Sequence, residues 1–72
     1  MSRQILSPEQ IGEKVKHLIK ENNLTQDAFA DLVCVDVRTA RRWLAGKGLD
    51  NISNINRCAE ILGVDVVTIL FE

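Results

Sequence analysis

The fold of this chain is decided by the stretch QDAFADLVCVDVRTARRWLAG, residues 26–46. The stretch predicts two short helices separated by a tight break. Thr25 can cap the first of them, and Asp27 lies favourably in its first turn, where the helix dipole stabilises an acidic side chain. Apolar residues then recur at helical spacing, which predicts one buried side for this helix. These residues are Phe29, Leu32 and Val33.

The second helix of the stretch follows the break at Cys34 and Val35. Asp36 can cap it, and we expect it to run over residues 37–45. Gly46 can adopt the left-handed conformation that ends many helices. Residues 34–46 therefore contain a turn, a cap, a helix and a stop in succession.

The predicted helix 37–45 has two chemically different sides. At about 100° per residue, one arc of roughly 140° holds three arginines together with two small apolar residues. The opposite side holds Trp43 and Ala40, and the small Ala40 allows a second helix to approach closely. We therefore expect a helix that is buried on one side and basic on the other. The residues of the basic side are Val37, Arg38, Arg41, Arg42 and Ala45.

The first helix outside this stretch is predicted by a dense N-terminal cap. Ser7 can cap it, Pro8 suits its first position, and Gln10 can close a capping box with Ser7. Asn22 and Asn23 indicate its end.

The C-terminal third predicts two more helices. Asn51 can cap one of them, and Gly63 can stop it. Its inward-facing residues are expected to be Ile52, Ile55, Ala59 and Leu62. Asp65 opens the last segment, whose β-branched residues 66–69 suit a strand as well as a helix. A short helix is the preferred interpretation, because a single strand would have no partner.

The composition indicates one small cytoplasmic domain. The chain has 72 residues and a net charge of −1. We expect a single domain over residues 1–72, with residues 1–7 as an N-terminal tail. Cys34 and Cys58 have no spacing typical of zinc sites and fit a reducing cytosol. No apolar run approaches the ~18 residues that a membrane span needs.

Residues 26–46 resemble the helix-turn-helix of the lambda-repressor/Cro-like (XRE) DNA-binding domains. The resemblance continues from about Ile11 to Leu70. It implies an all-α, compact five-helix lambda-repressor-like domain with the helix-turn-helix at helices 2 and 3. The residues that occupy the family's characteristic positions are Gln26, Ala30, Cys34, Ala40 and Trp43.

Two positions depart from the family's pattern. Cys34 stands at the turn where the family usually has glycine, and a non-glycine residue in a left-handed conformation costs roughly 1–2 kcal/mol. Val37 stands at the entry of the recognition helix, where a polar residue is common. A valine can contact a thymine methyl group but cannot hydrogen-bond a base edge.

The resemblance also implies a set of DNA contacts. The third helix would enter the major groove with its N-terminal residues at the base edges. Arg38 is the best candidate for a bidentate contact to guanine, Arg42 comes next, and Arg41 can read a base or bind phosphate. The base contacts would come from Val37, Arg38, Arg41 and Arg42, and the phosphate contacts from Thr25, Gln26, Lys47 and Asn51.

The functional hypothesis is a small regulator, most simply a repressor, that recognises double-stranded DNA by sequence. Residues 66–72, VVTILFE, are the expected surface of a homodimer on a near-palindromic operator. Because the chain ends directly after the fifth helix, we expect no small-molecule effector. A cytoplasmic protein of a bacterium or phage, associated with the nucleoid, fits this interpretation.

Of two alternatives to DNA binding, the sequence leaves one open and argues against the other. The net negative charge leaves open a protein-interaction module, or an antitoxin-like partner, that keeps the fold without specific DNA binding. An enzyme is not expected, because the sequence shows no catalytic arrangement, no metal-ligand spacing and no glycine-rich phosphate loop. We accordingly expect no catalytic residue, no metal and no cofactor.

Overall fold

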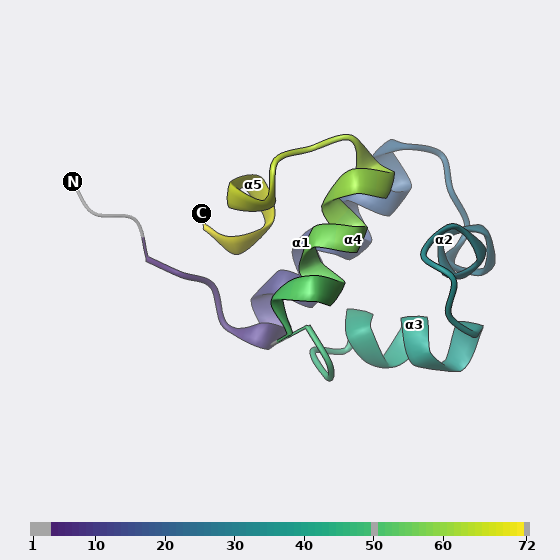
Figure 1. Ribbon diagram of the computed structural model, residues 1–72, viewed down its shortest axis with the longest axis horizontal. Coiled ribbons are helices and arrows are strands. Elements are labelled where there is room, and N and C mark those ends of the chain that lie inside the picture. The colour runs from purple at the N-terminus through teal and green to yellow at the C-terminus, as the bar shows by residue number, and fades with distance from the viewer. Residues whose placement is uncertain (1–3, 50, 72) are drawn as a thin grey trace.

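The computed structural model describes residues 4–49 and 51–71, which form helices joined by turns and short loops (Figure 1). The expected residues 1–3 of the tail, and Glu72 of the expected dimer surface, lie outside the described residues. The expected all-α fold with five helices is confirmed. The helices are α1 (Pro8–Glu21), α2 (Gln26–Leu32), α3 (Val37–Leu44), α4 (Ile52–Leu62) and α5 (Val66–Leu70).

The helices begin where the sequence predicts caps. The Ser7 hydroxyl accepts from the backbone N–H of Gln10, whose side chain accepts from the Ser7 N–H in return. Thr25 caps α2, and the Asn51 side chain accepts from the N–H of Ser53 at the start of α4. Because each cap satisfies a backbone donor that has no partner within its helix, these residues fix the helix starts.

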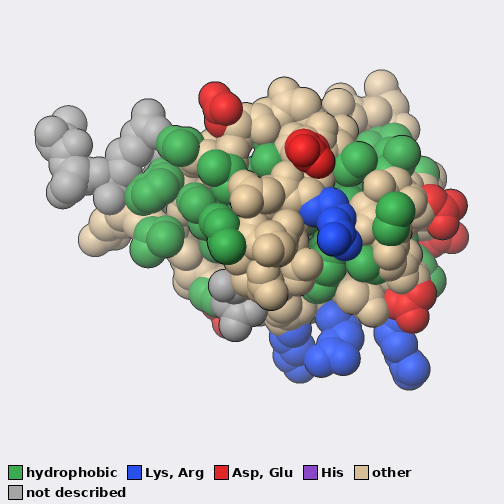
Figure 2. Space-filling view, viewed as in Figure 1, with side chains coloured by type: hydrophobic (Ala, Val, Ile, Leu, Met, Phe, Trp, Pro, Cys, Tyr) green, Lys and Arg blue, Asp and Glu red, His purple; other side chains and the backbone are tan. Residues whose placement is uncertain are grey.

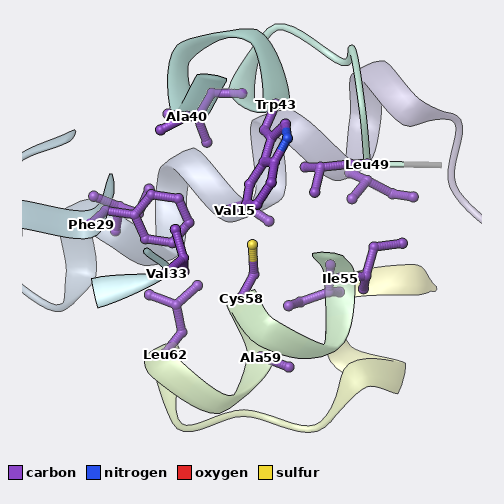
Figure 3. Close-up of a cluster of buried hydrophobic side chains, with 14 of the residues drawn as sticks. Val15, Phe29, Val33, Ala40, Trp43, Leu49, Ile55, Cys58, Ala59 and Leu62 are labelled. Carbon is purple, nitrogen blue, oxygen red and sulfur yellow. The ribbon is translucent and has the colours of Figure 1, made fainter. Parts of the chain in front are cut away.

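The core is aliphatic around two aromatic rings. Figure 3 shows the Trp43 ring projecting from α3 into the centre of the cluster, with Cys58 of α4 below it. Cys58 is buried, and burial raises the pKa of its thiol to about 12. The prediction is wrong for two residues that were expected to lie in the core. Leu32 and Ile52 expose 47% and 53% of their surface.

A close approach between helices joins α1 to the end of α3. A Cβ atom on Gly12 would lie 2.6 Å from the carbonyl oxygen of Leu44 and 2.9 Å from that of Trp43. Gly12 is therefore the small residue that lets α1 pack directly on the α3 backbone. Ala40, which was expected to let a second helix approach α3, is fully buried, and the role of Gly12 was not predicted.

The last segment is the helix α5, as preferred, and it is attached to the N-terminal segment. The N–H of Leu6 donates to the carbonyl of Leu70 at 2.7 Å, and Ile5 forms an antiparallel bridge with Phe71. Lys14 of α1 donates from Nζ to the carbonyl of Phe71 at 2.6 Å. We call these three contacts the terminal clasp. They hold the end of α5 against residues from the beginning of the chain.

Candidate nucleic-acid interface

The turn before α3 is built from backbone geometry and a single carboxylate. Cys34 adopts a left-handed conformation with φ of 62°, as its position in the turn predicts. Oδ1 of Asp36 accepts from the N–H of Thr39 at 2.8 Å. Hydrogen bonding with the side chain and then the backbone of Thr39 lowers the pKa of Asp36 below its ordinary value of 3.8. The carboxylate that caps α3 therefore stays ionised at neutral pH.

The predicted inner side of α3 is confirmed by burial. Ala40, Trp43 and Leu44 are buried, at 0%, 5% and 6% exposure. Trp43 is also held from outside the helix, because a Cβ on Gly48 would lie 2.8 Å from its Cδ1 atom. With its inner side fixed by these contacts, α3 presents the opposite side to solvent in a single orientation.

The outer side of α3 is a basic surface with a hollow in it. The side chains of Arg38, Arg41 and Arg42 are exposed, whereas Val37 is half-buried and packs against the core. Between them lies an open hollow of about 360 Å³, which we call the α3 hollow. It is lined by Val37, Arg38, Arg41, Arg42, Ala45 and Lys47. All four residues predicted to contact bases are thus brought together, along with one predicted phosphate contact.

The guanidinium groups of this surface face solvent. In Figure 2 basic side chains project from the lower edge of the molecule, where α3 lies in Figure 1. Among residues 4–49 and 51–71, the one contact within 4 Å between a basic and an acidic side chain joins His17 and Glu21 on α1, at 3.2 Å. Within that part of the chain, no carboxylate forms a salt bridge with the arginines of α3, and Asp36 interacts with Arg38 only at longer range. The surface therefore has the charge and accessibility that a polyanion requires.

The other predicted phosphate contacts lie outside the α3 hollow. Thr25 and Gln26 stand at the start of α2, and Asn51 stands before α4. The oxygens of Thr25 and Asn51 already accept cap hydrogen bonds, which leaves the Thr25 hydroxyl proton and the Asn51 amide as donors. The structure thus separates a central basic surface from these flanking groups.

Two residues of this region were not among the predicted contacts. Ala45, which was predicted to lie on the basic side of α3 but not to contact DNA, lines the α3 hollow. Thr39 lines a second, smaller hollow of about 200 Å³ with Arg42, Trp43, Lys47 and Gly48. The helical angle of Thr39 lies between the two sides of α3, so periodicity alone assigns it to neither.

Other kinds of site find little support in the described chain. Residues 4–49 and 51–71 contain no group of three or more His, Cys, Asp or Glu side chains that could hold a metal ion. Within the same residues, none of the helices combines the length and apolar character that crossing a bilayer requires.

The helix-turn-helix family model matches residues 15–69, and the chain belongs to that family. The lambda-repressor/Cro-like resemblance is thereby confirmed. In this fold the second helix of the motif, here α3, is the one placed in the major groove of duplex DNA. No curated protein matches the chain.

Solved structures share the fold at low sequence identity. The clp gene regulator ClgR from C. glutamicum superposes with a TM-score of 0.81 and 15% identity, over 92% of this chain and 86% of its own. Hydroxypropylphosphonic acid epoxidase from S. wedmorenis gives 0.81 and 20%, over 89% of this chain. The epoxidase HppE with iron and substrate gives 0.81 and 20% over the same share. This chain spans only about a third of the epoxidase chains, at 34% and 37%.

Proposed function

We propose that this protein is a small regulator, acting as a repressor, that recognises double-stranded DNA by sequence through α3. The observation that supports this most directly is the outer side of α3. Three exposed arginines stand on a helix whose inner side is buried, and no described carboxylate pairs with them. Such a surface is available to bind an anion such as the DNA backbone. The proposal is also supported by the regulator ClgR, which has the same fold and of whose chain this protein covers 86%.

Base recognition is assigned to the N-terminal two turns of α3. Arg38 lies in the first turn and would donate two hydrogen bonds to O6 and N7 of a guanine, the commonest specific contact in the major groove. Arg42 follows one turn later on the same side. Val37 and Arg41 complete the set of base contacts, with Arg41 also within reach of phosphate.

Phosphate contacts would frame this surface on both sides. Thr25 and Gln26 would donate to the backbone of one strand, and Lys47 and Asn51 to the other. Phosphate contacts fix the orientation of the domain on the duplex, whereas base contacts select the sequence.

A homodimer on a near-palindromic operator would double this limited set of contacts. Half-sites one turn apart would be separated by about 34 Å. Apolar side chains gather around the terminal clasp, where Ile5 exposes 66% and Val67 44% of its surface, and where Figure 2 shows a cluster of hydrophobic side chains. Val66–Phe71 is the proposed dimer surface, and sedimentation of the free protein and of Val67→Glu tests it. A dimer that persists in this variant would contradict the assignment.

The test of DNA recognition measures duplex binding as a function of salt. About four to six phosphate contacts predict a log–log slope of roughly −4 to −5 on random duplex. Arg38→Ala should lose about 1–3 kcal/mol on the duplex selected from a random pool and relax one base-pair preference. Lys47→Ala should weaken all duplexes equally and make the slope shallower by about 1. Lys20→Ala, at the end of α1 away from α3, is the matched control and should change neither preference nor slope substantially.

The second candidate is a module that binds protein. Its support is the net charge of −1 and the occurrence of the same fold as a third of an epoxidase chain. A salt slope near zero, with no sequence recovered from the random pool, would favour this candidate. An equal loss for Arg38→Ala on selected and random duplex would instead make Arg38 a phosphate contact.

A further inference from the structure

The α3 hollow combines a charged rim with an apolar floor. More carbon than nitrogen or oxygen surface faces the hollow, although four of its six lining residues are basic. The carbon comes from Val37, from Ala45 and from the aliphatic stems of the basic residues, which lie along the helix while their charged ends reach solvent. A guanidinium surface that only binds phosphate does not require such a floor.

The floor restricts what the hollow can receive from duplex DNA. Base pairs present hydrogen-bonding groups in the major groove and, at the C5 position of thymine, one methyl group. Cytosine presents a methyl group there only when it is methylated at the same ring position. Water in an apolar hollow finds few hydrogen-bond partners, so a methyl group replaces it favourably.

Val37 is the residue best placed to meet such a group. It is the first residue of α3, at the end of the recognition helix that contacts base edges. It is half-buried against the core, so its side chain is held by packing before DNA arrives. Val37 cannot donate a hydrogen bond, and no polar base group would be satisfied by it.

We propose that the α3 hollow recognises the C5-methyl group of a pyrimidine through Val37, and that thymine and 5-methylcytosine both supply it. The inference rests on the proposed function and adds a specificity to it. Arg38 follows Val37 in the chain and lines the same hollow. The methylated pyrimidine therefore neighbours the guanine that Arg38 reads. A site containing cytosine at that position becomes a better ligand when the cytosine is methylated.

The experiment begins with a duplex selected from a random pool by the unaltered protein. Each pyrimidine of the half-site is then compared with and without its C5-methyl group, as thymine against uracil and as 5-methylcytosine against cytosine. At one base pair the methyl group should tighten binding about four-fold (~0.8 kcal/mol), and at the others less than two-fold. This comparison uses the unaltered protein, so its outcome does not depend on the folding of a variant.

Variants then identify the residue responsible. Val37→Ala should reduce the methyl effect to less than two-fold. Val64→Ala is the matched control, because it removes the same atoms from another half-buried valine, in the loop between α4 and α5 on the far side from α3 (Figure 1). Arg38→Ala should weaken binding and leave the methyl effect in place.

The outcomes separate this inference from the proposed function. A protein that selects no sequence and shows no salt dependence would overturn both. Sequence preference and a normal salt slope, without a methyl effect at any pyrimidine, would overturn only the methyl inference. An effect that survives Val37→Ala would also overturn it. A preference for thymine over uracil, with cytosine and 5-methylcytosine equal, would support the inference for thymine and overturn it for 5-methylcytosine.

Discussion

The helices α3 and α5 begin alike and are held in place differently. Each is short, each follows an aspartate, and each presents an outer side to solvent. The α3 helix is capped by Asp36 and anchored by three buried residues, whereas Asp65 makes no side-chain cap bond and α5 buries only Ile69. The terminal clasp holds α5 instead, through backbone groups and Lys14.

The difference fits the functions proposed for the two outer sides, base recognition by α3 and dimerisation by α5. A helix that reads bases must hold its side chains in one orientation, because a small displacement loses a bidentate hydrogen bond. The anchors of α3 supply that rigidity. An apolar surface such as that of α5 depends on area rather than on direction. A clasp at one end is enough to keep such a surface in place.

The largest expected effect comes from removing the anchor of α3. Trp43→Ala should lower the free energy of unfolding by ~3–5 kcal/mol, and Ile69→Ala, the corresponding change in α5, by ~2–5 kcal/mol. Urea denaturation of both variants measures the difference. Thr68→Ala, exposed on α5, is the control and should stay within about 0.5 kcal/mol of the parent. If Trp43→Ala proved the milder change, α3 would not be the more firmly anchored helix.

The second-largest effect is expected at Gly12, where α1 closely approaches α3. Glycine to alanine within an exposed helix normally stabilises by about 0.5–1 kcal/mol. At Gly12 the new Cβ would meet backbone oxygens at 2.6 and 2.9 Å, which cannot move aside as side chains do. We expect Gly12→Ala to destabilise by about 1–3 kcal/mol instead, since this is overpacking. The sign of the change in thermal unfolding decides the matter, and stabilisation would show that α3 does not rest on α1 at this point.

Local rules account for most of what could be predicted. The caps at Ser7, Thr25, Asp36 and Asn51 depend on neighbours within three residues, and all four are present. The two sides of α3 follow from helical angles alone, since Trp43 and Ala40 stand opposite the arginines. Helix caps and the two sides of α3 are therefore the features that the sequence predicts best.

The errors arise at helix ends and where the answer depends on distant elements. The buried side of α2 centres on Phe29, Ala30 and Val33, so Leu32 falls on its flank, about 100° away. Ile52 has a suitable angle but stands first in α4, one turn before the buried Ile55. The terminal clasp joins Lys14 to a carbonyl 57 residues along the chain, and no local pattern indicates such a contact.

The two aspartates offer a smaller and more selective test of the comparison. Asp36→Ala should lower Tm by a few degrees, because a backbone donor of α3 loses its partner, while Asp65→Ala should leave Tm nearly unchanged. The pKa of Asp36 is lowered in the folded state, so its contribution is complete above the ordinary value of 3.8. That contribution is lost as the pH falls below 3.8 through the folded-state pKa.

Stability measured by Tm between neutral and strongly acidic pH checks this dependence. Asp36→Asn keeps a cap that does not titrate and serves as the control. With either substitution at Asp36, Tm should fall less steeply as the pH is lowered into the acidic range. Asp65→Ala should not change this dependence. An unchanged acid limb in Asp36→Asn would remove Asp36 as its origin.

The smallest effect concerns the residues that lead into the two helices. Both turns contain a left-handed residue, Cys34 with φ of 62° before α3 and Gly63 with φ of 68° before α5. Only the turn before α3 has a side chain there, and because Cys34 is exposed, its removal sacrifices little packing. Cys34→Gly should therefore stabilise the fold by about 0.5–1 kcal/mol, the relieved strain less the added entropy of the unfolded chain.

The reverse change at the other turn completes the comparison. A Cβ on Gly63 would have nothing within 4 Å, so Gly63→Ala introduces backbone strain and no steric contact. It should destabilise by about 1 kcal/mol, and thermal unfolding of both variants would show opposite signs. If Cys34→Gly also destabilised the protein, the thiol would have to contribute to the turn in a way that its exposure does not suggest. The strained entry to α3 would then be a requirement of the recognition helix rather than a tolerated departure from glycine.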